Sequence, residues 1–175
     1  MSVIGQEKVD NKSKTGLSKR EKRKAERDAR QLILFEEARE AIENKSFVLE
    51  AYRVDFDNGT TVNLNKTTNF VSLDEKKGTI QLAFDIPKTG LNGLGGVTVD
   101  GAASSMKKKI NKRGDLYFSF IIQGTLSSAT VEIYLTKGNN DCRATITPNL
   151  NGQKISFRGE LIPFEKSNIF KGRSI

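Results

Sequence analysis

The chain has 175 residues, enough for one domain with a hydrophobic core, and a formal net charge of +8. It contains no histidine and a single cysteine, Cys142. This composition excludes His-based catalytic triads, intrachain disulfides and clusters of thiolate metal ligands. No apolar run approaches the roughly 18 residues that a membrane span needs. The basic excess permits contact with anionic partners, although net charge alone does not identify one.

Residues 1–17 show no periodic pattern, so we expect a disordered leader. Within it, the short stretch Val3-Ile4-Gly5-Gln6 resembles the end of a secretory signal at its cleavage point. We therefore expect an export signal ending near Gly5, and a periplasmic or secreted protein. The alternative is an ordinary cytoplasmic start with a frayed terminus.

A helix is predicted over residues 18–45, opening with a capping box between Ser18 and Glu21. Apolar residues recur along one face of its second half, which we expect to pack on the sheet while the first half projects into solvent. These residues are Leu32, Phe35, Ala38 and Ile42, with Leu34 and Ala41 beside them.

The two halves of this helix differ in charge. Residues 19–30 hold seven basic and three acidic side chains, whereas residues 36–43 hold four glutamates and one arginine. The basic half raises the alternative of a nucleic-acid-binding protein, but it has no aromatic residue to stack on bases. A solvated leader is the favoured interpretation, because runs of charge are usually solvated.

Residues 46–175 are predicted to form an antiparallel β domain. Inward Val131, Ile133 and Leu135 alternate with outward Glu132 and Tyr134, and short polar turns separate the strands. The fold class is mainly β (α+β): an N-terminal helix followed by an antiparallel meander, closed as a barrel or as a two-sheet sandwich. The expected strands cover residues 47–56, 61–65, 69–74, 79–86, 96–110, 115–123, 130–137, 142–150 and 153–161.

Three local features of this domain are also predicted. The apolar phase of the first strand changes near Tyr52, which indicates a β-bulge. The long strand over residues 96–110 is expected to kink around Gly101. Pro163 ends the last strand, and the apolar Phe164, Ile169 and Phe170 predict a C-terminal tail that docks on the domain.

A glycine-rich loop lies between two predicted strands, over Gly90-Leu-Asn-Gly-Leu-Gly-Gly96. A dinucleotide fingerprint would need a helix after these glycines, but Val97-Thr-Val-Asp100 is typical of a strand. A wide connection that uses its glycines for backbone geometry is therefore favoured. The alternative is the mouth of a barrel that holds a small apolar ligand, and the candidate mouth residues are Gly90, Asn92, Gly93, Gly95 and Gly96.

A second candidate site is an anion-binding rim made by Lys107, Lys109, Lys112 and Arg113. Strand alternation sends Lys108 to the face opposite Lys107 and Lys109, so a solvated rim at the end of a strand is the favoured interpretation. The sequence predicts no cofactor and no metal site.

An enzyme would have to use carboxylates. Asp85, Glu132 and Glu160 fall on polar strand faces, where solvation is the expected outcome. Cys142 lies beside Arg143, but a nucleophilic cysteine usually needs a basic partner and the chain has no histidine. We therefore expect a non-enzymatic protein.

Several segments, in the same order, resemble an uncharacterised family of secreted or lipid-anchored proteins from Bacteroidota, domain of unknown function 4251. The similarity runs from about Lys22 to the C-terminus. It is carried by residues 23–27 (RKAER), 69–72 (NFVS), 92–101 (NGLGGVTVDG) and 167–174 (SNIFKGRS). The resemblance implies an envelope location and a β-rich fold, and it implies no activity.

Three functions stay open from the sequence. A binding or interaction module of the cell envelope, its partner an unknown envelope protein or a small apolar ligand, is favoured. A nucleic-acid-binding protein that uses the basic helix comes second, and a carboxylate-based hydrolase third.

Overall fold

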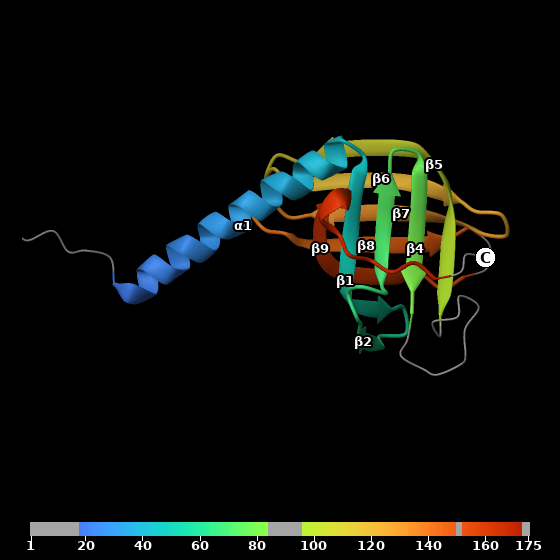
Figure 1. Ribbon diagram of the computed structural model, residues 1–175, viewed down its shortest axis with the longest axis horizontal. Coiled ribbons are helices and arrows are strands. Elements are labelled where there is room, and N and C mark those ends of the chain that lie inside the picture. Colours follow the sequence, from blue (N-terminus) through green and yellow to red (C-terminus); the bar gives the residue numbers. More distant parts are fainter. Residues whose placement is uncertain (1–17, 84–95, 150–151, 173–175) are drawn as a thin grey trace, which may run out of the picture.

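The computed structural model describes residues 18–83, 96–149 and 152–172, and within them one long helix precedes nine strands (Figure 1). The elements are α1 (Lys19–Glu43), β1 (Ser46–Phe56), β2 (Thr61–Asn63), β3 (Phe70–Asp74), β4 (Lys77–Leu82), β5 (Val97–Ile110), β6 (Leu116–Gln123), β7 (Ser128–Leu135), β8 (Asp141–Pro148), β9 (Ile155–Pro163) and the 3₁₀ turn η1 (Phe164–Lys166).

The sheet is an antiparallel meander that closes on itself. From β3 to β9 each strand pairs with the next along the chain, and β1 pairs with both β3 and β9. This closure confirms a barrel rather than a sandwich. The short strand β2 adds to the second half of β1. In Figure 1, β1 and β4 lie in front and β6 to β9 cross behind them.

The barrel interior is filled by its own side chains. Phe47, Phe120 and Phe157 are fully buried, and the Phe47 ring meets the Phe118 and Phe120 rings edge-on at centroid distances of 6.0 and 6.2 Å. Burial of each such side chain stabilises the fold by about 1.5–3 kcal/mol. The expected inward positions on β7, which are Val131, Ile133 and Leu135, all belong to this core.

The helix α1 begins with the predicted capping box. The backbone N–H of Glu21 donates to Ser18 Oγ at 3.3 Å, and the Ser18 N–H donates to Glu21 Oε2 at 2.7 Å. Its second half packs against β1 and β9, with Phe35, Ala38, Ala41 and Ile42 buried. The first half extends beyond the barrel (Figure 1) and is exposed throughout, as predicted.

The prediction that Leu32 packs on the sheet is wrong, because this side chain is 49% exposed. Successive steps of three residues rotate by about 300° on a helix, so Leu32 lies about 60° further round than Phe35 and points away from the barrel.

The bulge predicted near Tyr52 is confirmed. On β1, Ala51 pairs with Gly159 and Arg53 pairs with Arg158, so Tyr52 is the extra residue. The bulge inverts the inward and outward phase of β1. Arg53 therefore points outward, although two residues earlier Ala51 points into the core.

The expected kink at Gly101 is displaced to the following residues of β5. The register shifts between Ser104 and Lys107, and Ser105 has a φ of 54°. Gly101 instead allows two backbones to approach, since a Cβ there would lie 2.0 Å from the carbonyl oxygen of Gln123.

The C-terminal tail docks, as predicted, on the outer face of β3 and β4. The buried Gln81 side chain holds it there: Nε2 donates to the Phe170 carbonyl at 2.7 Å, and Oε1 accepts from the Gly172 N–H at 2.6 Å. The Phe170 ring itself stays 61% exposed. Backbone hydrogen bonds to Gln81, rather than burial of the expected ring, therefore hold the tail.

Replacing Gln81 by methionine should release this tail. Gln81 also donates to Thr68 O and accepts from Thr98 Oγ1, so the variant loses four hydrogen bonds and should be destabilised by about 2–4 kcal/mol. Amide exchange at Phe170 should accelerate with it. Thermal melts and hydrogen exchange test this, with the exposed Gln123→Met as control, and an unchanged exchange rate in Gln81→Met would contradict the assignment.

Candidate functional site

The register of the barrel aligns six outward-facing side chains in a line across β5, β6, β7, β8, β9 and β1. Each is paired directly with the next on the neighbouring strand. We call this line the outer row, and its members are Lys109, Tyr117, Tyr134, Arg143, Arg158 and Arg53. The row lies on the part of the outer face that the C-terminal tail leaves uncovered.

Three arginines, Arg143, Arg158 and Arg53, occupy consecutive positions of the outer row, and we call them the arginine cluster. Directly opposed residues of antiparallel strands have Cβ atoms about 4.5–5.5 Å apart, and like charges there destabilise the sheet. Among the described residues, Arg143 has no ion pair. The cluster therefore concentrates positive charge that the fold itself does not need.

A single carboxylate, Asp55, contacts two members of the cluster. Its Oδ1 lies 3.0 Å from Arg53 Nε and its Oδ2 lies 3.7 Å from Arg158 Nε, while Thr61 Oγ1 donates to Oδ1 at 3.0 Å. Burial acts to raise the pKa of Asp55, but the hydrogen bonds from Thr61 and Arg53 and the two positive charges outweigh it, so the pKa lies below its ordinary value. Asp55 is therefore ionised at neutral pH and offsets one of three charges.

Neither of these contacts is well aligned. Within the described part of the chain, Nε of Arg53 and Nε of Arg158 are buried atoms without a hydrogen-bond acceptor, although Arg53 Nη2 does donate to Asp55 at 3.2 Å. The cluster thus retains hydrogen-bonding capacity as well as charge.

Two tyrosines continue the outer row beyond the arginines. The rings of Tyr117 and Tyr134 lie 4.8 Å apart, tilted by 44°, and Tyr117 is 44% exposed. Tyr134, Arg143 and Arg158 line a hollow of about 180 Å³ together with Thr136, Asp141 and the edge of Cys142. This hollow combines cationic forks, an aromatic ring and polar acceptors, which is a suitable lining for a small polar anion.

A second hollow of about 250 Å³ lies where α1 meets the barrel. It is lined by Gln31 and Leu34 of α1, by Tyr52 and Glu160, and by residues 139–141 of the β7–β8 turn. The Tyr52 hydroxyl donates to Asp141 Oδ1 at 2.7 Å, and burial together with this bond raises the pKa of Tyr52. Asp141 lines both hollows, so they are neighbours on the surface.

The junction between α1 and the barrel is fixed by Asn140. Its side-chain oxygen accepts from the Leu161 N–H at 3.1 Å, and its backbone N–H donates to Gln31 Oε1 at 3.4 Å. Because Asn140 is buried, the turn, β9 and the helix are held together at this point.

The anion-binding rim predicted from the sequence is only partly brought together. Lys107 and Lys109 point outward from β5, while Lys112 and Arg113 lie in the turn that follows it. Lys108 points the other way and pairs with Glu43 of α1 at 3.1 Å, as alternation predicted. Lys109 is the member that joins the outer row.

The predicted ligand mouth lies mostly outside the described residues, which exclude Gly90, Asn92, Gly93 and Gly95. Gly96 is described, and a Cβ there would lie 1.8 Å from the carbonyl oxygen of Leu82. This contact supports the backbone-geometry interpretation at Gly96.

The candidate acid and nucleophile residues are not arranged as a catalytic group. Glu132 is exposed, Glu160 pairs with Lys66 at 2.7 Å, and Asp85 lies outside the described residues. Burial and the nearby Asp141 raise the pKa of the Cys142 thiol, which keeps it protonated. Across the described ranges, no cluster of three or more acidic or cysteine side chains could hold a metal ion, and no helix is long and apolar enough to cross a bilayer.

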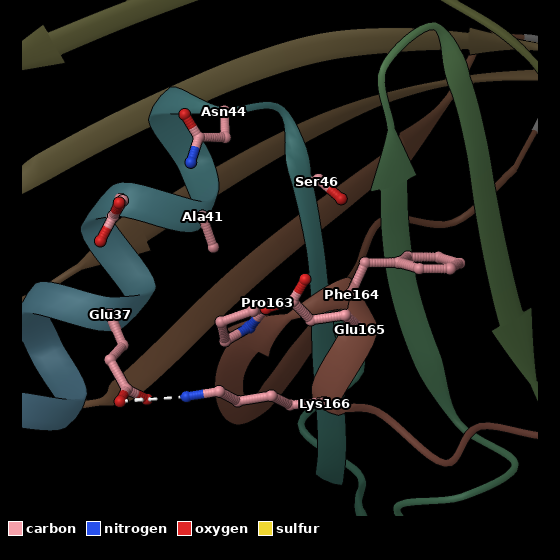
Figure 2. Close-up of a pocket in the computed structure, with 9 residues that line it drawn as sticks. Glu37, Ala41, Asn44, Ser46, Pro163, Phe164, Glu165 and Lys166 are labelled. Carbon is pink, nitrogen blue, oxygen red and sulfur yellow. Dashed lines mark ion pairs between the residues drawn. The ribbon is translucent and has the colours of Figure 1, made fainter.

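A further hollow of about 280 Å³ separates α1 from η1 (Figure 2). Its lining includes Glu37, Glu40 and Glu165, and its lysine, Lys166, reaches across to Glu37 at 3.1 Å. This ion pair links α1 to η1. Because Lys166 is already paired with Glu37, it is not free to bind an anion. The residues that line this hollow also do not form a general acid and general base pair.

Sequence analysis missed the arginine cluster. Alternation could place single residues such as Tyr134 on the outer face, but which residues of β8, β9 and β1 stand opposite one another depends on the register. The bulge at Tyr52 shifts that register by one residue, and without it Arg53 would not align with Arg158.

The ionised Asp55 should stabilise the fold in a pH-dependent way. Its folded pKa is depressed, so its contribution is present above the unfolded carboxyl pKa of about 4 and is lost as the pH falls through the folded value. Asp55→Asn should therefore melt below the wild type at pH 7, and the gap should narrow toward pH 3. A gap that stays constant over this range, or equals that of the exposed Asp57→Asn, would contradict the account.

Comparison with known proteins identifies the family. The model of a domain of unknown function, DUF4251, matches residues 29–161. A crystal structure of a DUF4251 family protein from Bacteroides eggerthii is similar with a TM-score of 0.71 and 43% sequence identity, over 85% of this chain and 99% of the other. Among curated proteins, none matches. The chain therefore belongs to the DUF4251 family.

Proposed function

We propose that this protein is a non-enzymatic binding module of the cell envelope, periplasmic or secreted, which recognises an anionic ligand through the arginine cluster. The observation that carries the proposal is the direct opposition of Arg53, Arg158 and Arg143 with one contacting carboxylate, Asp55. A guanidinium presents a planar fork that pairs with two oxygens of a carboxylate or phosphate, so adjacent arginines suit such a ligand.

The energetics favour a bound anion. Opposed like charges destabilise neighbouring strands, and Asp55 offsets only part of that repulsion. An anion placed between Arg143 and Arg158 would relieve it, since Arg143 forms no ion pair with the described residues. The neighbouring Tyr134 ring offers a flat surface beside the charge.

The proposal assigns recognition to the outer wall rather than to the barrel interior. The interior among the described residues is packed with fully buried phenylalanines and aliphatic side chains. A small apolar ligand inside the barrel would have to displace them, and well-packed cores resist such changes.

The direction of the carboxyl pKa shifts supports a non-enzymatic role. Among the described residues, each carboxyl whose pKa departs from its ordinary value is lowered. The pKa of Glu21 is lowered through the Ser18 backbone N–H, that of Asp115 through hydrogen bonding from Asn111, and that of Asp55 as described above. A general acid in a hydrolase needs the opposite shift.

The envelope location rests on residues 3–6 and on the family resemblance, and it predicts a processed N-terminus. Cells that express the full gene should yield a mature protein, in the periplasm or medium, that begins near Gly5 or Gln6. Fractionation followed by mass spectrometry of the N-terminal peptide tests this. Recovery of an intact Met1 in the cytoplasm would contradict it.

Binding can be measured with digalacturonate, a short saccharide that carries two carboxylates, by isothermal titration calorimetry at low salt. Arg143→Gln/Arg158→Gln should weaken binding by at least about tenfold, because charge-assisted hydrogen bonds are lost.

The matched control is Lys76→Gln/Lys77→Gln, which removes the same charge at the β3–β4 turn and lines neither hollow. It should bind as the wild type does. Equal losses in both double variants, or no binding by the wild type, would contradict recognition by the arginine cluster.

A further inference from the structure

The first half of α1 has a one-sided charge distribution. On a helix with about 100° of rotation per residue, six basic side chains fall within an arc of about 140°, and Glu21, Glu26 and Asp28 lie outside it. All are exposed. We call this arc the basic stripe, and it consists of Lys19, Arg20, Arg23, Lys24, Arg27 and Arg30.

The basic stripe faces the side on which the barrel lies. Gln31 and Leu34 fall within the same arc, and both line the second hollow, opposite Tyr52 and Glu160. The helix passes this point and continues beyond the barrel (Figure 1). Over residues 19–30 it overhangs by about 18 Å. The basic stripe therefore lies on the side of the overhanging helix that faces the barrel. The outer face of the barrel lies opposite it.

The hollows connect the overhang to the arginine cluster. Arg143 and Arg158 line the first hollow together with Asp141, and Asp141 also lines the second hollow together with Gln31. An elongated ligand anchored at the arginine cluster can follow this path and reach the basic stripe. Two separate cationic surfaces would then act on one chain.

The middle of the path selects the chemistry of that ligand. Asp141 and Glu160 lie between the two cationic surfaces, and carboxylates only accept hydrogen bonds. Glu160 already pairs with Lys66, so Asp141 carries the remaining negative charge here. Each unit of a polyuronate carries free hydroxyl groups beside its carboxylate, whereas a DNA strand has no free hydroxyl between its phosphates. The acceptors in this hollow therefore favour the sugar. The amides of Asn139 and Gln31 at the same place can pair with hydroxyls too.

We propose that the overhang of α1 and the outer wall together form one extended binding cleft for a linear acidic polysaccharide, of the uronate class. This inference rests on the proposed function, since the arginine cluster supplies its anchor. The arginine cluster and the basic stripe hold carboxylates at the two ends, and the polar middle accepts hydroxyls from the sugars between them.

The test compares galacturonate oligomers of two, four and eight units by isothermal titration calorimetry at fixed low salt. With the wild type, affinity should rise steeply from the shortest to the longest oligomer. Arg23→Gln/Arg27→Gln should bind the shortest as the wild type does and lose about tenfold or more for the longest. Lys76→Gln/Lys77→Gln, with the same net charge, should lose neither.

The outcomes separate the two proposals. Failure of the shortest oligomer to bind the wild type overturns the proposed function. Binding of the shortest with no gain in length, or a gain that Arg23→Gln/Arg27→Gln retains, overturns the extended cleft alone. Tighter binding of an oligothymidylate than of the octamer, at the same salt, overturns the polysaccharide in favour of nucleic acid.

Discussion

The pairing of β1 with β9 is the constraint on which the rest of this structure depends. It closes the meander into a barrel and runs nearly the whole length of both strands, from Phe47–Pro163 to Phe56–Ile155. The bulge at Tyr52 lets this long pairing serve two purposes. Before it, β1 buries Leu49 and Ala51, and after it β1 buries Val54 while Arg53 turns outward. The same bulge frees the Tyr52 side chain to reach Asp141, so closure of the barrel and construction of the outer surface have one cause.

The two halves of the outer face have different uses. Over β3 and β4 the C-terminal tail covers the sheet, and polar Gln81 is buried there with its hydrogen bonds satisfied. The tail also reaches the first half of β5, where Lys171 pairs with Asp100. The outer row lies beyond it and crosses the second half of β5, β6 to β9 and β1. Covering one half supplies stability, whereas aligning three arginines on the other half costs stability. A surface that is destabilising to the fold and open to solvent is where a binding role is expected.

Much of the fold followed from the sequence because it rests on local patterns. The capping box of Ser18 and Glu21 predicts the start of the helix. Alternation at residues 131–135 predicts which side chains of β7 point inward, and the change of apolar phase at Tyr52 predicts the bulge. Two local predictions were wrong. Leu32 lies outside the buried face of α1, and the irregular backbone of β5 is at Ser105 rather than at Gly101. The arginine cluster was out of reach, because it depends on the register between three strands and periodicity carries no register information.

The central claim is that recognition occurs on the outer wall and not inside the barrel. Amide chemical shifts of the labelled protein, followed by NMR during a digalacturonate titration, test it most directly. The account predicts shifts concentrated at Tyr134, Arg143 and Arg158 and at the adjoining Asp141. Shifts concentrated at interior positions such as Phe118 and Ile122, with the outer wall unchanged, would contradict it.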